Sequence, residues 1–373
     1  MRTITSLLAT LFVAAALSHA QTSATDREQM PAAPQPAAPE AIPSGTTFNV
    51  LLDGYYEYNF NHPPDRTTPL RPFDSAANNF TLSQGAVVIE RAPDPANGRR
   101  FGARLDLMFG SATESLSGSA ANEPRTAPYR NIYQAYGTYV APVGSGLNID
   151  FGRFSSPLGM EGTYAKDQMN YSRSLLFTAL PFYHMGFRTS YKLGGSTTAT
   201  WMLVNGANQM EDFNGFKSNH FMLSTSLSKN LSWTAGYYVG REGLGDGRTH
   251  IADTYLTWTA TPKLTLAGEG DSIVSRQFAN SAPARLTGGA GYAKYQVAPA
   301  FALAGRFEYV ADPGGILGVG AGNLKEATLT ASYQPAEGFQ VRWEYRHDAF
   351  AHKDQNTALI GLLFWFGGKQ GSW

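Results

Sequence analysis

The sequence predicts an all-β fold, a transmembrane up-and-down antiparallel β-barrel of about sixteen strands, with short turns at one end and longer loops at the other. Three observations lead to this prediction. Apolar and polar residues alternate with a period of two in many segments of about ten residues. Short and long connections alternate along the chain. After residue 20 no window holds eighteen consecutive apolar residues, so an integral protein would have to cross the membrane with strands.

Residues 1–20 have the features of a cleaved signal peptide. Arg2 precedes an apolar run over residues 4–17, and Ser18-His19-Ala20 provides the small-x-small pattern of a cleavage site. We therefore expect export and cleavage after Ala20. Residues 21–45 are rich in Pro and Ala and form a predicted periplasmic linker. The barrel is predicted over 46–366, followed by a short tail over 367–373.

Composition restricts the possible partners and chemistry. The chain has 29 Lys+Arg against 29 Asp+Glu, so bulk charge gives no reason to expect a nucleic-acid partner. Cysteine is absent, which excludes disulfides, thiolate metal sites and thiol nucleophiles. The 39 Gly, 19 Tyr and 22 Phe, with only 16% charged residues, suit many strands, tight turns and aromatic belts.

Strands follow from the alternation, in order along the chain. We predict them at 46–60, 79–91, 101–109, 130–140, 147–154, 182–193, 197–205, 219–228, 231–241, 249–259, 264–274, 285–297, 301–310 and 324–334, with two more in the hairpin 339–366. The connections 194–196, 229–230, 260–263, 298–300 and 335–338 are short, and those between them are longer. An even strand number places both termini in the periplasm.

The last hairpin shows the pattern most clearly. One face of its first strand is apolar and aromatic, with Phe339, Val341, Trp343 and Tyr345, whereas the residues between them are polar. Such a tall apolar band favours contact with lipid. The alternative is a soluble sandwich or propeller, which predicts polar outer faces and connections of similar length at both ends.

The end of the hairpin resembles the closing-strand signal of outer-membrane barrels. A glycine, Gly361, is followed at the appropriate spacing by Phe364 and Phe366. By this resemblance the barrel-assembly machinery would read the segment. Because seven residues follow Phe366, Trp373 is the other candidate for the terminal aromatic.

Charged residues of both signs occupy positions that the alternation directs inward, where water can solvate them. The predicted pore-lining residues are Asp53, Glu57, Arg104, Asp106, Arg188, Lys192, Arg306, Glu308, Arg342, Glu344 and Arg346. Glu269, Asp271 and Asp348 share this orientation. Mixed charge predicts weak ion selectivity. Alternatively, many of these residues pair across neighbouring strands and do no more than keep the wall in register.

The longest internal connection, 155–181, is the predicted constriction, because loops of this length are generally functional or disordered. Leu175, Leu176 and Phe177 make it too apolar to extend into water. Its charged residues Glu161, Asp167 and Arg173 would narrow the lumen, with the acids opposite inward arginines and lysines. The alternatives are an external cap or a contact between subunits of a trimer.

Several motifs resemble the OmpL-like β-barrel porin family of Gram-negative bacteria. They are Gly-Arg-Phe-Ser-Ser-Pro-Leu-Gly-Met-Glu at 152–161, Asn-Tyr-Ser-Arg-Ser at 170–174, Pro-Phe-Tyr-His-Met-Gly at 181–186, Gly-Tyr-Tyr-Glu-Tyr-Asn-Phe-Asn-His-Pro at 54–63 and Phe-Asp at 73–74. The resemblance implies an outer-membrane pore of unspecified solute, with porins of this size commonly trimeric. It supplies no catalytic residue.

An enzyme is the competing class of function. His184, His220, His250 and His347 lie near predicted strand ends, and a hydrolytic site would need one of them within hydrogen-bond reach of a nucleophile. Lone histidines at a rim are more typical of a solvated surface, so we assign no catalytic residue, metal site or cofactor.

The function that we predict is passive diffusion of small hydrophilic solutes across the outer membrane. The predicted partners are outer-membrane lipids and lipopolysaccharide, the barrel-assembly machinery, those solutes and further copies of the chain in a homotrimer. The alternative function is a barrel with a closed lumen whose loops serve adhesion or anchoring.

Overall fold

The computed structural model describes residues 45–116, 126–350, 353–369 and 372–373. The predicted signal peptide, 1–20, and all but the last residue of the predicted linker, 21–45, lie outside the described residues. No helix in the described part is long and apolar enough to cross a membrane.

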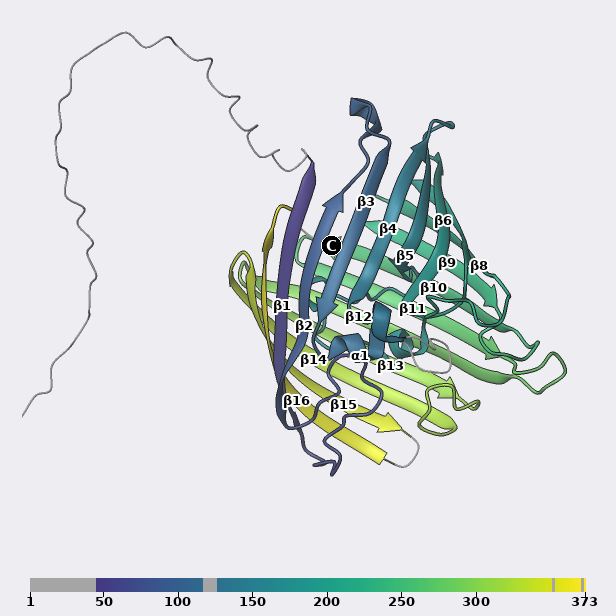
Figure 1. The fold of residues 1–373 in the computed structure, drawn as a ribbon. Coiled ribbons are helices and arrows are strands. Elements are labelled where there is room, and N and C mark those ends of the chain that lie inside the picture. Colours follow the sequence, from purple (N-terminus) through teal and green to yellow (C-terminus); the bar gives the residue numbers. More distant parts are fainter. Residues whose placement is uncertain (1–44, 117–125, 351–352, 370–371) are drawn as a thin grey trace, which may run out of the picture. The chain divides into compact units, whose positions relative to one another are not determined.

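Sixteen strands run through the described part of the chain and form one closed barrel (Figure 1). They are β1 Thr46–Asn59, β2 Asn79–Arg91, β3 Phe101–Phe109, β4 Ile132–Ala141, β5 Leu147–Ser155, β6 Tyr183–Gly194, β7 Thr197–Val204, β8 Ser218–Ser228, β9 Leu231–Gly240, β10 Thr249–Thr261, β11 Leu264–Ser275, β12 Ala284–Ala298, β13 Phe301–Asp312, β14 Gly322–Ala336, β15 Phe339–Phe350 and β16 Lys353–Gly367.

Each strand pairs antiparallel with the next, and β1 pairs with β16 to close the wall, from Asn49 opposite Gly367 to Asn59 opposite Thr357. Closure removes the unpaired strand edges that an open sheet would present. The predicted all-β barrel of sixteen strands is therefore confirmed. Its strand bounds differ from the predicted ones at most ends by only a few residues, because frayed or twisted ends carry little alternation.

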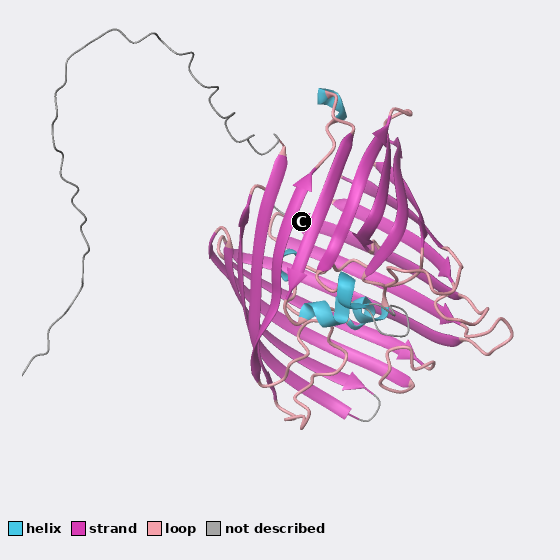
Figure 2. Ribbon diagram, in the orientation of Figure 1, coloured by secondary structure: helices cyan, strands magenta, loops and turns pink. Residues whose placement is uncertain are grey.

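Five short helical segments occur in the described residues, all of them in connections (Figure 2). They are η1 Pro95–Asn97, α1 Ala112–Leu116, α2 Thr126–Tyr129, η2 Ala165–Asp167 and α3 Leu175–Ala179. One end of the barrel carries short turns, such as the turn between β14 and β15 at Gly338, whose φ of 81° suits glycine. A side chain there would start 2.4 Å from the Trp365 carbonyl oxygen.

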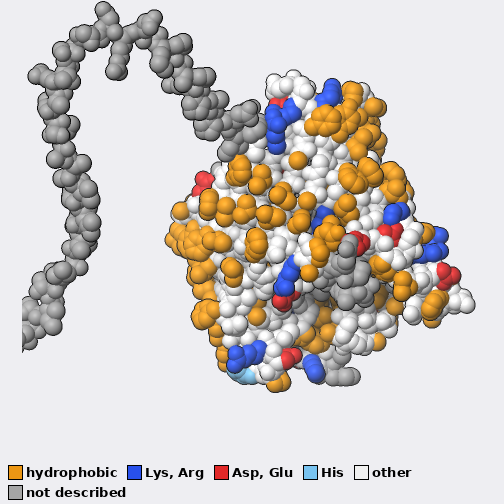
Figure 3. All heavy atoms as spheres, viewed as in Figure 1, with side chains coloured by type: hydrophobic (Ala, Val, Ile, Leu, Met, Phe, Trp, Pro, Cys, Tyr) orange, Lys and Arg blue, Asp and Glu red, His pale blue; other side chains and the backbone are white. Residues whose placement is uncertain are grey.

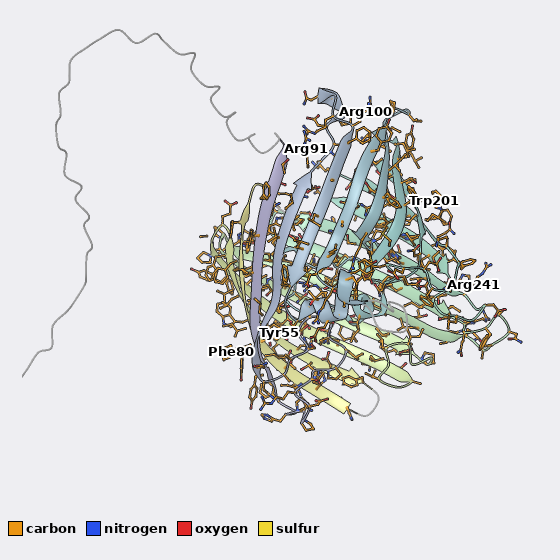
Figure 4. All side chains as sticks on the ribbon, in the orientation of Figure 1. Tyr55, Phe80, Arg91, Arg100, Trp201 and Arg241 are labelled. Atoms are coloured by element: carbon orange, nitrogen blue, oxygen red, sulfur yellow. The ribbon has the colours of Figure 1, made fainter. Side chains whose placement is uncertain are left out.

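The two faces of the wall reverse the usual distribution of residues in a soluble protein. Large apolar side chains point outward and are exposed, such as Phe80 at 82% and Phe101 at 69%, whereas inward charged side chains such as Glu57 are buried. Hydrophobic side chains cover much of the outer face in Figure 3, and Phe80 and Trp201 point away from the barrel in Figure 4. An exterior of this kind matches a lipid environment.

The C-terminal tail turns to the inner side of the wall after β16 ends at Gly367. The Lys369 backbone N–H donates to the side chain of Asn49 at 2.8 Å, and its ammonium pairs with Glu90 at 2.9 Å. Farther along, the Trp373 N–H donates to Asp167 at 3.2 Å, in agreement with the position of the C-terminus in Figure 1. The end of the chain therefore contacts the connection between β5 and β6.

Of the two candidate terminal aromatics, Phe366 lies on β16 opposite Val50 and is exposed on the outer face, whereas Trp373 lies off the strand. We therefore expect Phe366→Ala to reduce assembly strongly and Trp373→Ala to leave it nearly unchanged. Recovery of heat-modifiable protein in the outer-membrane fraction measures both. A defect confined to the Trp373 variant would place the assembly signal in the tail.

Candidate functional site: a loop inserted into the barrel

The connection between β5 and β6, residues 156–182, folds into the barrel, and we name it the inserted loop. The predicted constriction, 155–181, coincides with it except at its ends, because Ser155 still belongs to β5. Its side chains and backbone bind inward-facing groups on strands all around the wall. These hydrogen bonds are Tyr171 to Asp53 of β1 at 2.7 Å, Tyr164 to Asp106 of β3 at 2.8 Å, Gly159 to Asp253 of β10 at 3.1 Å, Leu175 to Glu308 of β13 at 2.8 Å and Tyr171 to Glu344 of β15 at 2.7 Å.

Two inward carboxylates accept hydrogen bonds from the loop backbone. Glu344 accepts the N–H groups of Tyr171 and Ser172 at 2.7 and 3.1 Å, and Glu308 accepts those of Leu175 and Leu176 at 2.8 and 3.3 Å. Such charge-assisted bonds are stronger than those between neutral groups. They fix the middle of the inserted loop. Two of the predicted pore-lining residues, Glu308 and Glu344, thus bind backbone N–H groups of the loop.

Two arginines hold loop carbonyls in the same way. Arg342 of β15 donates to the carbonyl oxygens of Asn170 and Gln168, each at 2.8 Å. Arg173, within the loop, donates to those of Gly162 at 2.7 Å and Thr163 at 2.6 Å. Both guanidiniums are buried, and their planar forks satisfy carbonyls that would otherwise lack partners.

Arg306 of β13 pairs with three carboxylates and thereby joins the wall to the inserted loop. Its guanidinium lies 3.1 Å from Glu161 of the loop, 3.1 Å from Glu308 and 2.8 Å from Glu326. It also donates to the Ser172 carbonyl at 2.8 Å. The acid Glu161 therefore does meet a wall arginine, although it is Arg306 and not one of the other inward arginines.

The connection between β1 and β2, residues 60–78, also folds inward, which the alternation of residues does not predict. Arg71 binds Asp348 and donates to the Arg173 carbonyl at 2.8 Å. The Phe73 ring lies 5.8 Å from that of Phe177 in the inserted loop. The one available signal was that residues 73–74 belong to the motifs that carry the family resemblance.

Asp74 in this first loop is buried beside Arg346, with 2.5 Å between Oδ2 and Nη1. Burial alone would raise the pKa of Asp74, but the guanidiniums of Arg346 and Arg71 outweigh it and lower the pKa below its ordinary value of 3.8. Glu57 shares Arg346 at 3.3 Å. The first loop is therefore held by an ionised carboxylate.

A lowered pKa in the folded state means that Asp74 stabilises the fold above pH 3.8 and loses this contribution as the pH falls through its folded pKa. We expect wild-type channels to become noisier and more conductive as the pH is lowered below about 4, because the first loop is released. Asp74→Asn should show this behaviour already at neutral pH, and Asp65→Asn, in the exposed part of the same loop, should not. Single-channel recordings across pH measure it, and identical pH profiles in wild type and Asp74→Asn would contradict it.

The remaining predicted residues lie on the wall or near the loop ends. Arg104 pairs with Asp106 of the same strand, β3, at 2.8 Å, whereas Arg188 of β6 pairs with Asp150 of the neighbouring β5 at 2.8 Å. Lys192 is exposed. Asp167 pairs with Lys166 at 2.8 Å in addition to its contact with the tail. A pore-lining role of these residues stays a prediction.

Open space remains in the interior toward the short turns. A cavity of about 530 Å³ is lined on β4 to β7 by residues that include Thr138, Asn148 and Arg188. Another, of about 430 Å³, lies at Lys294, Gln296 and neighbouring residues of β12 to β15. We call these two cavities, which polar and apolar side chains line together, the vestibule, and the inserted loop contributes Pro157 to the lining of the first of them.

His184 illustrates why the histidines do not suggest hydrolysis. Its Nδ1 lies 3.0 Å from the Gly206 carbonyl oxygen, so Nδ1 carries the proton and Nε2 accepts the hydroxyl of Ser156 at 3.1 Å. The two bonds join the start of the inserted loop to β6 and to the connection between β7 and β8. The Ser–His contact is buried among structural partners, with a carbonyl in the position where a catalytic triad has a carboxylate.

A closed antiparallel barrel with an apolar exterior, a polar interior and a loop packed inside it is the architecture of an outer-membrane porin-type barrel. Residues 45–371 match the model of the family described as "Putative beta-barrel porin-2, OmpL-like". The chain belongs to this family, which confirms the resemblance found in the motifs. Those motifs contribute Glu161, Asn170, Tyr171, Arg173 and Asp74 to the inserted segments.

Solved structures of outer-membrane barrels share the fold. A loop L8 deletion mutant of OmpT from Vibrio cholerae aligns with a TM-score of 0.60 at 12% identity, covering 86% of this chain and 99% of that one. An anion-selective porin from Comamonas acidovorans aligns with a TM-score of 0.58 at 10% identity, covering 86% and 99%. A trimer form of V. cholerae OmpT gives 0.59 at 11%, also covering 86% and 99%. No curated protein matches the chain.

Proposed function

We propose that this barrel is a non-enzymatic porin that lets small hydrophilic solutes diffuse passively through a lumen narrowed by the inserted loop. The observation that carries the proposal is the combination of a vestibule lined in part by charged and polar side chains with a loop that is fastened across the interior by inward-facing side chains. A loop that is held firmly in place narrows a channel to a constant width. A constant width suits passage that is limited by solute size.

The composition of the interior supports weak ion selectivity. Arg188 and Lys294 line the vestibule together with Asp150 and Glu337, so neither sign dominates there. Arg342 and Arg346 are buried against carbonyls and carboxylates, and their charges would reach a solute only weakly.

The proposed setting is the outer membrane of a Gram-negative bacterium, with both termini in the periplasm and lipids and lipopolysaccharide around the apolar exterior. The barrel-assembly machinery would insert it. A homotrimer is part of the proposal, supported by the fold shared with V. cholerae OmpT, which is described in a trimer form.

One observation favours the alternative, a barrel whose lumen is closed and whose loops serve adhesion or anchoring. Nine of the eleven predicted pore-lining side chains are buried, the exceptions being Arg188 and Lys192. A continuous passage past the inserted loop would have to run beside these buried groups.

Planar-bilayer recordings separate the two candidates. The porin proposal expects stable ohmic conductance from purified refolded protein, and swelling of proteoliposomes in sugars and amino acids below a size limit. Protein that is folded by heat-modifiability but neither conducts nor permits swelling would exclude the porin and leave the closed barrel.

A further inference from the structure

Three carboxylates meet on the inner face of β10 and β11, outside the contacts that hold the middle of the inserted loop. Asp253 of β10 lies directly opposite Asp271 of β11 in the strand register, and Glu269 is two residues from Asp271 on the same face. Like charges directly opposite each other destabilise a sheet. All three side chains are buried, with 3%, 3% and 7% exposure, so water does little to screen them.

The carboxylates converge on a single point. One oxygen from each residue lies within 4.8 Å of the others, the separation expected when three oxygens surround one ion. Both carboxylate oxygens of Asp271 and Oδ1 of Asp253 are buried and accept no hydrogen bond from an N–H or hydroxyl group of the described residues, and the group that Asp271 faces is the carboxylate of Asp253. Glu308 and Glu326, by contrast, are also buried acids but share the guanidinium of Arg306.

Buried carboxylate oxygens without a donor are rare in folded proteins, because each loses its hydration without replacement. A cation at the point of convergence would replace the lost hydration of Asp253 and Asp271, and Glu269 would add a third ligand. We propose that Asp253, Glu269 and Asp271 bind a divalent cation, with calcium as the ion that the site fits best.

The ligand chemistry separates calcium from other ions. A set made only of oxygen atoms suits calcium, magnesium or manganese and not the softer transition metals. Calcium takes many protein oxygens at about 2.3–2.6 Å in flexible geometry, whereas magnesium keeps several waters. Three carboxylates that converge inside a wall, with both oxygens of Asp271 available to the ion, favour the larger ion.

The proposed ion would also brace the inserted loop. Asp253 accepts the Gly159 N–H at 3.1 Å, and Glu269 accepts the Met160 N–H at 2.9 Å. These N–H groups use oxygens of two of the three proposed ligands. Fixing the carboxylates therefore also fixes residues 159–160 of the inserted loop against β10 and β11.

The test uses the full mature chain refolded into detergent free of lipopolysaccharide and freed of metal with EDTA. Tyr292 donates to Glu269 at 3.1 Å and can sensitise the luminescence of terbium, a calcium substitute, bound at this site. We expect one calcium per chain by calorimetric titration with CaCl₂, and terbium luminescence that calcium displaces at far lower concentration than magnesium.

Asp271→Asn should weaken calcium binding at least about 10- to 100-fold, since even outer-shell changes at metal sites cost that much. The matched control is Asp150→Asn, which removes another inward acid that already has Arg188 as its partner, and it should bind calcium like the wild type. Equal calcium affinity in the Asp271 variant and the wild type would overturn the proposal.

A readout on the wild type keeps the test decisive if the variant fails to fold. Calcium should raise the apparent unfolding temperature of the wild-type barrel by several degrees relative to EDTA, because an ion that binds only the folded state stabilises it. Asp271→Asn should unfold in EDTA no earlier than the wild type, since it removes one of two opposed charges. Absence of both stoichiometric binding and the calcium-dependent shift in the wild type would overturn the proposal without any variant.

Discussion

Deleting residues 159–178 and joining the ends with a short Gly-Ser link should raise the single-channel conductance several-fold while the barrel still assembles. β5 and β6 pair with each other directly, from Leu147 opposite Tyr191 to Ser155 opposite Tyr183, so the wall does not depend on the loop. A barrel of sixteen strands is wide enough to leave an aqueous channel, and the deletion leaves in place the first loop, 60–78, which is also folded inward. Planar-bilayer recordings of wild type and deletion variant, both checked by heat-modifiability, give the measurement.

The matched control shortens the connection between β11 and β12 within residues 277–282, where most residues are exposed, and should leave the conductance unchanged. A folded deletion variant with wild-type conductance would show that the inserted loop does not limit passage. A wild type that does not conduct, with a deletion variant that does, would instead favour the closed-lumen alternative.

Replacing Arg306 with Met should lower the free energy of unfolding by about 3–5 kcal/mol, the usual cost of removing one partner from a buried ion pair. The change leaves Glu161, Glu308 and Glu326 together in a buried place without the guanidinium that they share. Arg306→Lys keeps the charge but not the planar fork, so we expect an intermediate loss. Urea unfolding followed by tryptophan fluorescence measures both variants.

The control for this prediction is Arg188→Met. Arg188 is half-buried and pairs with one carboxylate, Asp150, which keeps the hydroxyl of Thr138 at 2.6 Å, so its loss should cost clearly less than the loss of Arg306. Equal destabilisation by the two substitutions would mean that the ion pairs of Arg306 contribute no more to the free energy of unfolding than a single ion pair on the wall.

The fold could be predicted because the relevant signal is local. Alternation of apolar and polar residues is read within one strand, and the aromatic face of β15 or the outward Phe301, Leu303 and Phe307 of β13 needs no knowledge of neighbours. The insertion of the long loop could be inferred for the same reason, since Leu175 and Leu176 are adjacent apolar residues in the sequence. In the structure both are buried.

The identity of the contacts could not be predicted, because it depends on residues far apart in the chain. Glu344 meets the Tyr171 N–H across 173 positions, and Arg71 meets Asp348 across 277. Alternation shows that a side chain faces inward but gives neither its height in the barrel nor which loop atom lies opposite. For this reason Arg342 and Arg346 were expected to face open water, whereas both are buried.

The convergence of Asp253 with Glu269 and Asp271 could not be predicted from the sequence, for a related reason. Asp253 and Asp271 are directly opposite only in the register of β10 and β11, and that register is set by the turn at 262–263. A shift of one residue would send one of them to the lipid face.

The inserted loop also constrains the order in which the protein can reach its native state. Its partners include Asp53 near the start of the barrel and Glu344 near its end, at separations of 118 and 173 residues. Contacts of such long range form late, because the chain entropy lost in closing those intervals must be recovered first. The loop can therefore dock only when the first and last parts of the wall have come together, so its ordering reports the completion of folding and not its beginning.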